Sequence, residues 1–247
     1  MRPITKLPIG TEITLDDGTK HVIKEKYNPY QDAKDPLCIN LGQYCVYCEA
    51  PFAYTRGLDV EHILPKDPAL GYSHLKYYWN NFLIGCPTCN GKGNKENKIE
   101  LPDNCHFPHL NNTYLSLKYD KGGVVIVNPE LQGKSYQKAL RLLKLVGLDK
   151  SPADSSQQDK RWQYRIKEWD FAERYKNRYE NGKCDLDCLI DYIKASGCWL
   201  IWYTVFSEHD EVKKRLISDF PGTAIECFDP DNHFYPVARN PGNEDPV

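Results

Sequence analysis

Two Cys-x-x-Cys pairs are the residues whose type and spacing indicate chemistry most directly. Cys45 and Cys48 form the first pair and Cys86 and Cys89 the second, with 37 residues between them. Four thiolates suit tetrahedral zinc, and each pair supplies two ligands from one tight turn. The first residues lack the apolar core of a secretory signal, which disfavours disulfides. We therefore predict a structural Zn²⁺ on these four cysteines.

A carboxylate and an imidazole lie between the two pairs, at Glu61 and His62. Apolar and polar residues alternate over residues 58–63, which predicts a short strand ended by Pro65. The carboxylate can bind a hard divalent cation, and a neutral imidazole can take a proton from water. Neighbouring side chains of a regular strand point to opposite faces, whereas Asp59 and Glu61 share one. Either the strand ends or twists at His62, or Asp59 joins the metal site; Glu61 is the favoured ligand.

Two asparagines complete a specific pattern. Asn81 precedes an apolar run and Asn90 directly follows the second cysteine pair. The order His62, Asn81, Asn90 resembles an HNH endonuclease of the four-cysteine type, in which the last position is often His. The resemblance implies a ββα-metal finger with His62 as general base, Glu61 and Asn90 as ligands of the catalytic metal, and Asn81 as a brace that orients His62 through its backbone. Oxygens from Glu61 and Asn90 suit Mg²⁺ or Mn²⁺ better than a soft metal.

A closer resemblance covers nearly the whole chain. The first cysteine pair, residues 60–66, residues 79–90, residues 201–206 and residues 220–224 resemble the PtuB family, the HNH subunits of Septu-type and retron-associated antiphage systems. The resemblance implies a PtuA-like partner ATPase and a hetero-oligomer. Family members carry Lys three residues after the last Asn, where this chain has Gly93. The expected phosphate contact therefore stays open between Lys92 and Lys95, and Lys66 is a further candidate for binding substrate.

The elements that must position these residues fall into two halves. Turn residues predict one hairpin within residues 12–24 and a second within residues 114–127. After residue 129 the apolar spacing is that of helices, including a long basic helix with an aromatic stripe and a helix capped by Asp185. We predict an α+β protein in which residues 1–130 form an HNH nuclease lobe and residues 131–247 a mainly helical lobe that contacts the partner and DNA.

Charge is distributed unevenly along the chain. Its formal net charge is −2, which argues against a bulk nucleic-acid coat protein. Residues 134–183 carry 13 Lys and Arg against 7 Asp and Glu, whereas residues 184–247 carry 5 against 12. A basic segment followed by an acidic segment can bind a polyanion with the first and a basic partner with the second. No apolar stretch approaches the roughly 20 residues that cross a bilayer, so we expect a cytoplasmic protein without membrane contact.

The residues predict a metal-dependent HNH endonuclease that cleaves DNA. The resemblance alone implies that it serves as the nuclease subunit of an ATPase-associated antiphage complex. Two alternatives stay open. In the first, the chain is a zinc-stabilised module that binds nucleic acid or protein and has an inactive HNH site. In the second, it is a free-standing HNH nuclease of the restriction type. The one Gly-rich string, residues 91–95, is not a P-loop, so this chain is not expected to hydrolyse ATP itself.

Overall fold

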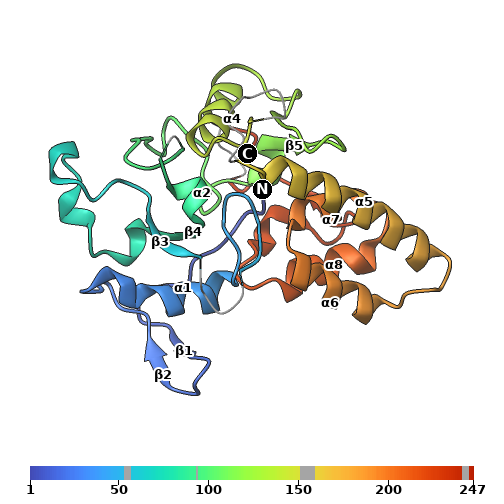
Figure 1. Ribbon diagram of the computed structural model, residues 1–247, viewed down its shortest axis with the longest axis horizontal. Helices are drawn as coiled ribbons and strands as arrows, with labels where there is room; N and C mark the ends of the chain where they lie inside the picture. Colours follow the sequence, from blue (N-terminus) through green and yellow to red (C-terminus); the bar gives the residue numbers. More distant parts are fainter. Residues whose placement is uncertain (53–56, 93, 151–158, 241–244) are drawn as a thin grey trace.

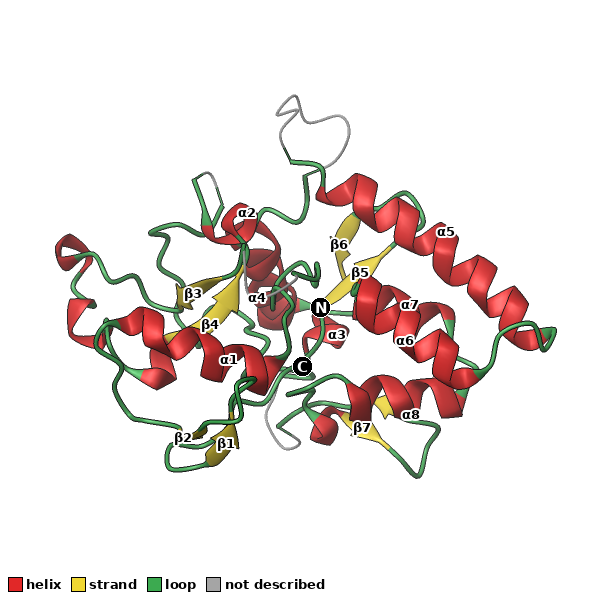
Figure 2. Ribbon diagram, turned by 60° about the horizontal axis from the view of Figure 1, so that its bottom comes forward, coloured by secondary structure: helices red, strands yellow, loops and turns green. Residues whose placement is uncertain are grey.

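The computed structural model describes residues 1–52, 57–92, 94–150, 159–240 and 245–247. Strands are short and helices gather in the second half of the chain (Figures 1 and 2). The first half contains β1 (Glu12–Thr14), β2 (Lys20–Val22), α1 (Lys34–Leu41), β3 (Asp59–His62), β4 (Phe82–Gly85), α2 (Pro87–Asn90), α3 (Thr113–Ser116), β5 (Leu117–Tyr119) and β6 (Val125–Val127). The predicted α+β class is confirmed.

Helices dominate the rest of the chain. They are α4 (Gly133–Leu145), α5 (Arg161–Glu180), α6 (Leu186–Ser196), α7 (Trp199–Val205) and α8 (Asp210–Asp219), followed by the two-residue strands β7 (Phe228–Asp229) and β8 (Tyr235–Pro236). Asp185 caps α6 as predicted, because its carboxylate accepts a hydrogen bond of 2.8 Å from the Cys188 amide. In Figure 2 the helices α5 to α8 lie together on the side of the molecule away from β3 and β4.

The described strands form four separate two-stranded antiparallel sheets. Both predicted hairpins are present, as β1–β2 and β5–β6. The β3–β4 pair joins segments on either side of a 19-residue connection that contains three short 3₁₀ helices (Pro68–Leu70, Ser73–Leu75 and Trp79–Asn81). In its register Glu61 faces Leu83 and His62 faces Phe82. All four residues of β4 are buried, which anchors β3 against the core.

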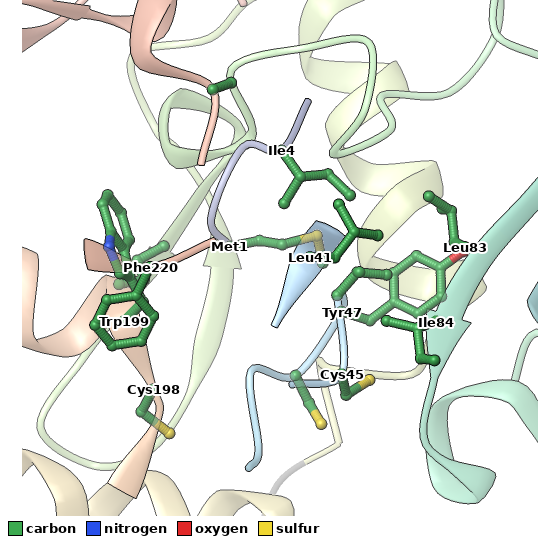
Figure 3. Close-up of a cluster of buried hydrophobic side chains, with 14 of the residues drawn as sticks. Met1, Ile4, Leu41, Cys45, Tyr47, Leu83, Ile84, Cys198, Trp199 and Phe220 are labelled. Carbon is green, nitrogen blue, oxygen red and sulfur yellow. The ribbon is translucent and has the colours of Figure 1, made fainter. Parts of the chain in front are cut away.

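One hydrophobic core joins the two predicted lobes. Figure 3 shows side chains from the first 90 residues, such as Met1 and Tyr47, in one buried cluster with Trp199 and Phe220. The buried guanidinium of Arg2 adds polar links across the same boundary, to the carbonyls of Phe220 and Pro221. Buried residues from both sides of residue 130 therefore pack into one core. Among the described residues, no helix is both long and apolar enough to cross a bilayer.

Candidate active site and metal centre

The four cysteines of the two pairs converge on one buried point. The Sγ atoms of Cys45, Cys48, Cys86 and Cys89 all lie within 4.8 Å of one another, and those of Cys48 and Cys86 are 3.7 Å apart. Sulfurs at ~2.3 Å from a tetrahedral zinc are separated by ~3.8 Å. The donor set and its spacing therefore fit zinc, and all four thiols are free of disulfides.

Local backbone geometry explains why each pair presents two thiols together. The first pair ends in a tight turn, in which the Glu49 amide donates to the Cys45 carbonyl at 2.9 Å and Glu49 has a φ of 62°. The second pair begins α2, where the Cys86 Sγ accepts from the Cys89 amide. The next residue, Asn90, ends that helical turn. The candidate zinc site thus also fixes the position of Asn90.

Arg161, at the start of α5, contacts this cluster from the far half of the chain. One of its guanidinium nitrogens lies 3.0 Å from the Cys89 Sγ, and the guanidinium also donates to the carbonyls of Val146 and Gly147 and pairs with Asp159. Four thiolates around Zn²⁺ carry a net negative charge, so a fixed cation beside one sulfur stabilises the filled site. Sequence reasoning missed this residue, because 72 positions separate it from Cys89.

Arg161→Met is expected to weaken zinc binding by about 10- to 100-fold, the usual cost of losing an outer-shell partner. The substitution keeps an unbranched side chain at this position but removes the charge-assisted bond to Cys89. Zinc release can be followed with a chromogenic chelator, next to Arg174→Met on the exposed face of the same helix. Equal release rates for the two variants would contradict a role for Arg161 at the zinc site.

Glu61 and Asn90 lie on the same side of the β3–β4 pair, beside Gly85. A Cβ placed on Gly85 would be 3.4 Å from the Glu61 Cβ and 3.7 Å from the Asn90 Cβ. Glu61 is only 1 % exposed, and burial raises the pKa of its carboxyl, an effect opposed by the Lys95 ammonium. The structure thus brings the two predicted metal ligands together. Asp59 starts the same strand but is exposed.

His62 occupies the other side of the strand. Its Nε2 lies 3.0 Å from the Lys76 carbonyl, and because a carbonyl only accepts, Nε2 must carry the proton. The ring packs edge-on against Tyr30 and Phe82. Burial lowers the pKa of His62 to about 4. The imidazole is therefore neutral near pH 7, with the unprotonated Nδ1 able to accept a proton. The described contacts do not bring it to Glu61 or Asn90.

Asn81 connects the two ends of the loop between β3 and β4. Its side-chain oxygen accepts from the Leu64 amide at 2.8 Å, and its side-chain nitrogen donates to the Leu64 carbonyl at 2.9 Å and to the Leu75 carbonyl. Its backbone carbonyl accepts from the Ile63 amide, next to His62. Asn81 therefore ties the start of this connection to its end.

The three lysines proposed to bind substrate have different environments. Lys66 is partly exposed and lies 4.1 Å above the Tyr30 ring, which itself contacts His62. Lys92 is exposed. Lys95 is fully buried and paired with Glu61, so its placement contradicts the predicted contact with a substrate phosphate. Gly93, where the family pattern has Lys, lies outside the described residues.

Comparison with known families agrees with this geometry. Residues 45–96 match the family model described as HNH endonuclease, a span that begins at the first zinc-site cysteine and extends past Asn90. The chain therefore carries an HNH endonuclease domain in its first half. No curated protein matches the chain.

Proposed function

We propose that this protein is a metal-dependent HNH endonuclease that cleaves DNA, with His62 as general base and with Glu61 and Asn90 as ligands of a catalytic Mg²⁺ or Mn²⁺. The observation that carries the proposal is the HNH match over residues 45–96, within which Glu61 and Asn90 converge beside the four-cysteine cluster. Hard oxygen donors fit either cation, and two protein ligands leave room for water and phosphate.

The protein groups have defined tasks in phosphodiester hydrolysis. A bound divalent cation would neutralise phosphate charge and stabilise the departing oxygen. Nδ1 of His62 takes a proton from water as the water oxygen bonds to phosphorus, and the bond from phosphorus to the departing sugar oxygen breaks. The Lys76 carbonyl holds the imidazole in the tautomer that leaves Nδ1 unprotonated. Asn81 holds the loop that follows His62.

A lysine collar near His62 supports a polyanionic substrate. We use this name for Lys66 and Lys76, whose ammonium groups lie 4.1 and 5.0 Å from the ring centres of Tyr30 and Tyr77. Contact with an aromatic face restrains a flexible lysine while its charge remains available. Lys66 and Lys76 also help to lower the pKa of His62, which places both charges near the imidazole.

Replacing Lys66 and Lys76 together by Ala is expected to weaken DNA binding and to reduce the slope of log K against log salt by about 1.8, because two phosphate contacts are lost. The carbonyl that holds His62 remains in Lys76→Ala. Fluorescence anisotropy in EDTA, across a salt series, measures binding without cleavage. Lys20→Ala with Lys214→Ala, two exposed lysines outside the basic segment 134–183, is the matched control. If the slope of log K against log salt is unchanged in the Lys66→Ala, Lys76→Ala variant, DNA does not bind at the lysine collar.

Plasmid cleavage by the purified chain, with Mg²⁺ or Mn²⁺ titrated in, tests the enzymatic proposal. Metal-dependent cleavage supports it. Salt-sensitive DNA binding without cleavage at any metal concentration, by the chain alone and with its partner, would instead support the alternative of a binding module with an inactive site.

We further propose that the chain acts as the nuclease subunit of an ATPase-associated antiphage complex in the cytoplasm, with residues 131–247 providing most of the ATPase contact. The support is the resemblance to PtuB proteins and the uneven charge of the helical half. Affinity purification of the tagged full-length chain from its source cells tests this: a stoichiometric ATPase supports the complex, and an active nuclease recovered alone supports a free-standing enzyme.

A further inference from the structure

A completely buried lysine contacts both residues of the Glu61–His62 pair. The Lys95 ammonium lies 2.7 Å from Oε1 of Glu61 and donates to the His62 carbonyl at 2.5 Å. Lys95 is 0 % exposed and Glu61 is 1 % exposed. Burying two charges is costly unless they are paired with good hydrogen-bond geometry, so this contact strongly restrains both side chains.

The restraint acts on one oxygen of the carboxylate. The Tyr47 hydroxyl also donates to Oε1, at 3.0 Å, so Lys95 and Tyr47 share the same acceptor. Among the described residues, no side chain donates to Oε2; the His62 backbone amide also interacts with the carboxylate. Because Gly85 has no side chain, the space beside Glu61 and Asn90 stays free of a Cβ. The two side-chain donors thus hold Glu61 through Oε1 and leave Oε2 without a side-chain partner.

The backbone around Lys95 ties it to the zinc-site cysteines. The Lys95 amide donates to the Cys89 carbonyl at 3.1 Å, and the next amide, of Glu96, donates to the Asn90 carbonyl at 3.2 Å. The turn after α2 is therefore fixed to the second cysteine pair, and its lysine reaches back to β3. One residue thus connects the candidate zinc site through its backbone with the predicted metal ligand and the backbone of the predicted base through its side chain.

We propose that Lys95 is a positioning residue: together with Tyr47 it holds Oε1 of Glu61, so that Glu61 offers a divalent cation Oε2 alone, and it fixes β3 at His62. This inference rests on the proposed nuclease function and replaces the phosphate contact expected from the sequence. In this arrangement the Glu61 carboxylate would bind the cation through one oxygen only. Without Lys95, Oε1 keeps only the hydrogen bond from Tyr47, and the carboxylate can turn to bind through both oxygens.

Terbium luminescence tests the coordination directly and needs no catalysis. Tb³⁺ is a hard cation that prefers oxygen ligands to the cysteine thiolates. Tb³⁺ emission that is present in the unmodified chain and lost in Glu61→Gln identifies the ion bound at this site. The luminescence lifetimes measured in H₂O and in D₂O give the number of water molecules bound to that ion. Lys95→Met is expected to lose about one bound water relative to the unmodified chain, because a second carboxylate oxygen replaces it. Lys98→Met, an exposed lysine three residues on, is the matched control and should keep the full count.

Kinetics provide the second readout. At saturating Mn²⁺, Lys95→Met is expected to lower kcat about 10- to 100-fold, as loss of an outer-shell partner does, with KM for DNA unchanged and partial recovery in Lys95→Arg. Tyr47→Phe removes the other bond to Oε1 and should shift hydration and kcat in the same direction by less. It serves as the test variant if thermal unfolding shows that Lys95→Met does not fold.

The outcomes separate the two proposals. An unchanged water count and unchanged kcat in a folded variant would overturn the positioning role. Faster cleavage with tighter metal binding would overturn it as well, because Lys95 would then be a competitor of the metal. If the unmodified chain cleaves no DNA but Lys95→Met still loses a bound water, the proposed nuclease function fails while the positioning of Glu61 stands.

Discussion

His62→Ala is expected to reduce DNA cleavage by about two to four orders of magnitude, the usual contribution of a positioned acid–base group. The imidazole is held in one tautomer by the Lys76 carbonyl and kept neutral by burial, so it accepts a proton without first losing one. DNA binding should survive, because it depends on lysine and arginine contacts with phosphate. Plasmid cleavage and anisotropy, measured on the same preparation, separate the two effects.

The matched control is His74→Ala, which removes an exposed histidine from the same loop. It should cleave at the rate of the unmodified chain. Glu61→Ala and Asn90→Ala should also lose cleavage, through weaker binding of the catalytic metal, and excess Mn²⁺ should partly restore them but not His62→Ala. Cleavage at the unmodified rate by a folded, zinc-loaded His62→Ala protein would remove the HNH mechanism from consideration.

Local sequence patterns predicted the features that depend on near neighbours. Two cysteines three positions apart must share a turn, so their zinc-type cluster could be predicted from spacing alone. Asp185 could be predicted as a cap because its acceptor reaches an amide only three residues on. Regular alternation along β3 would put Glu61 and His62 on opposite faces, so a shared site required the strand to end or twist at His62. In the structure β3 ends at His62, and the two side chains have separate contacts.

Contacts that cross long stretches of chain could not be predicted in this way. The sequence presents Lys95 as one of several lysines after Asn90, and its burial against Glu61 depends on how the turn after α2 folds back onto β3. Arg161 reaches Cys89 only because α5 packs beside the cysteine cluster. In both cases an ordinary solvated charge and a buried, paired one have the same sequence signature, and tertiary packing decides between them.

Removal of zinc is expected to unfold the protein. Zinc contributes about 10–16 kcal/mol to small zinc-binding peptides, whereas whole domains are stable by only about 5–15 kcal/mol. Here the four cysteines are buried within the common core, and Figure 3 shows Cys45 in one cluster with Tyr47 and Ile84, so the loss would not stay local. Cys48→Ser should therefore release the metal and abolish or sharply lower the thermal transition.

Metal analysis of the unmodified chain should give about one zinc per chain, as a closed site of four cysteines requires. Cys188→Ser, at an exposed cysteine outside the cluster, is the control that should keep both the metal and the unfolding temperature. Chelation of the unmodified chain should reproduce the effect of Cys48→Ser, and added Zn²⁺ should reverse it. A metal-free chain that unfolds at the temperature of the zinc-loaded chain would show that core packing holds the finger without the ion, and Arg161 would then have no thiolate charge to balance.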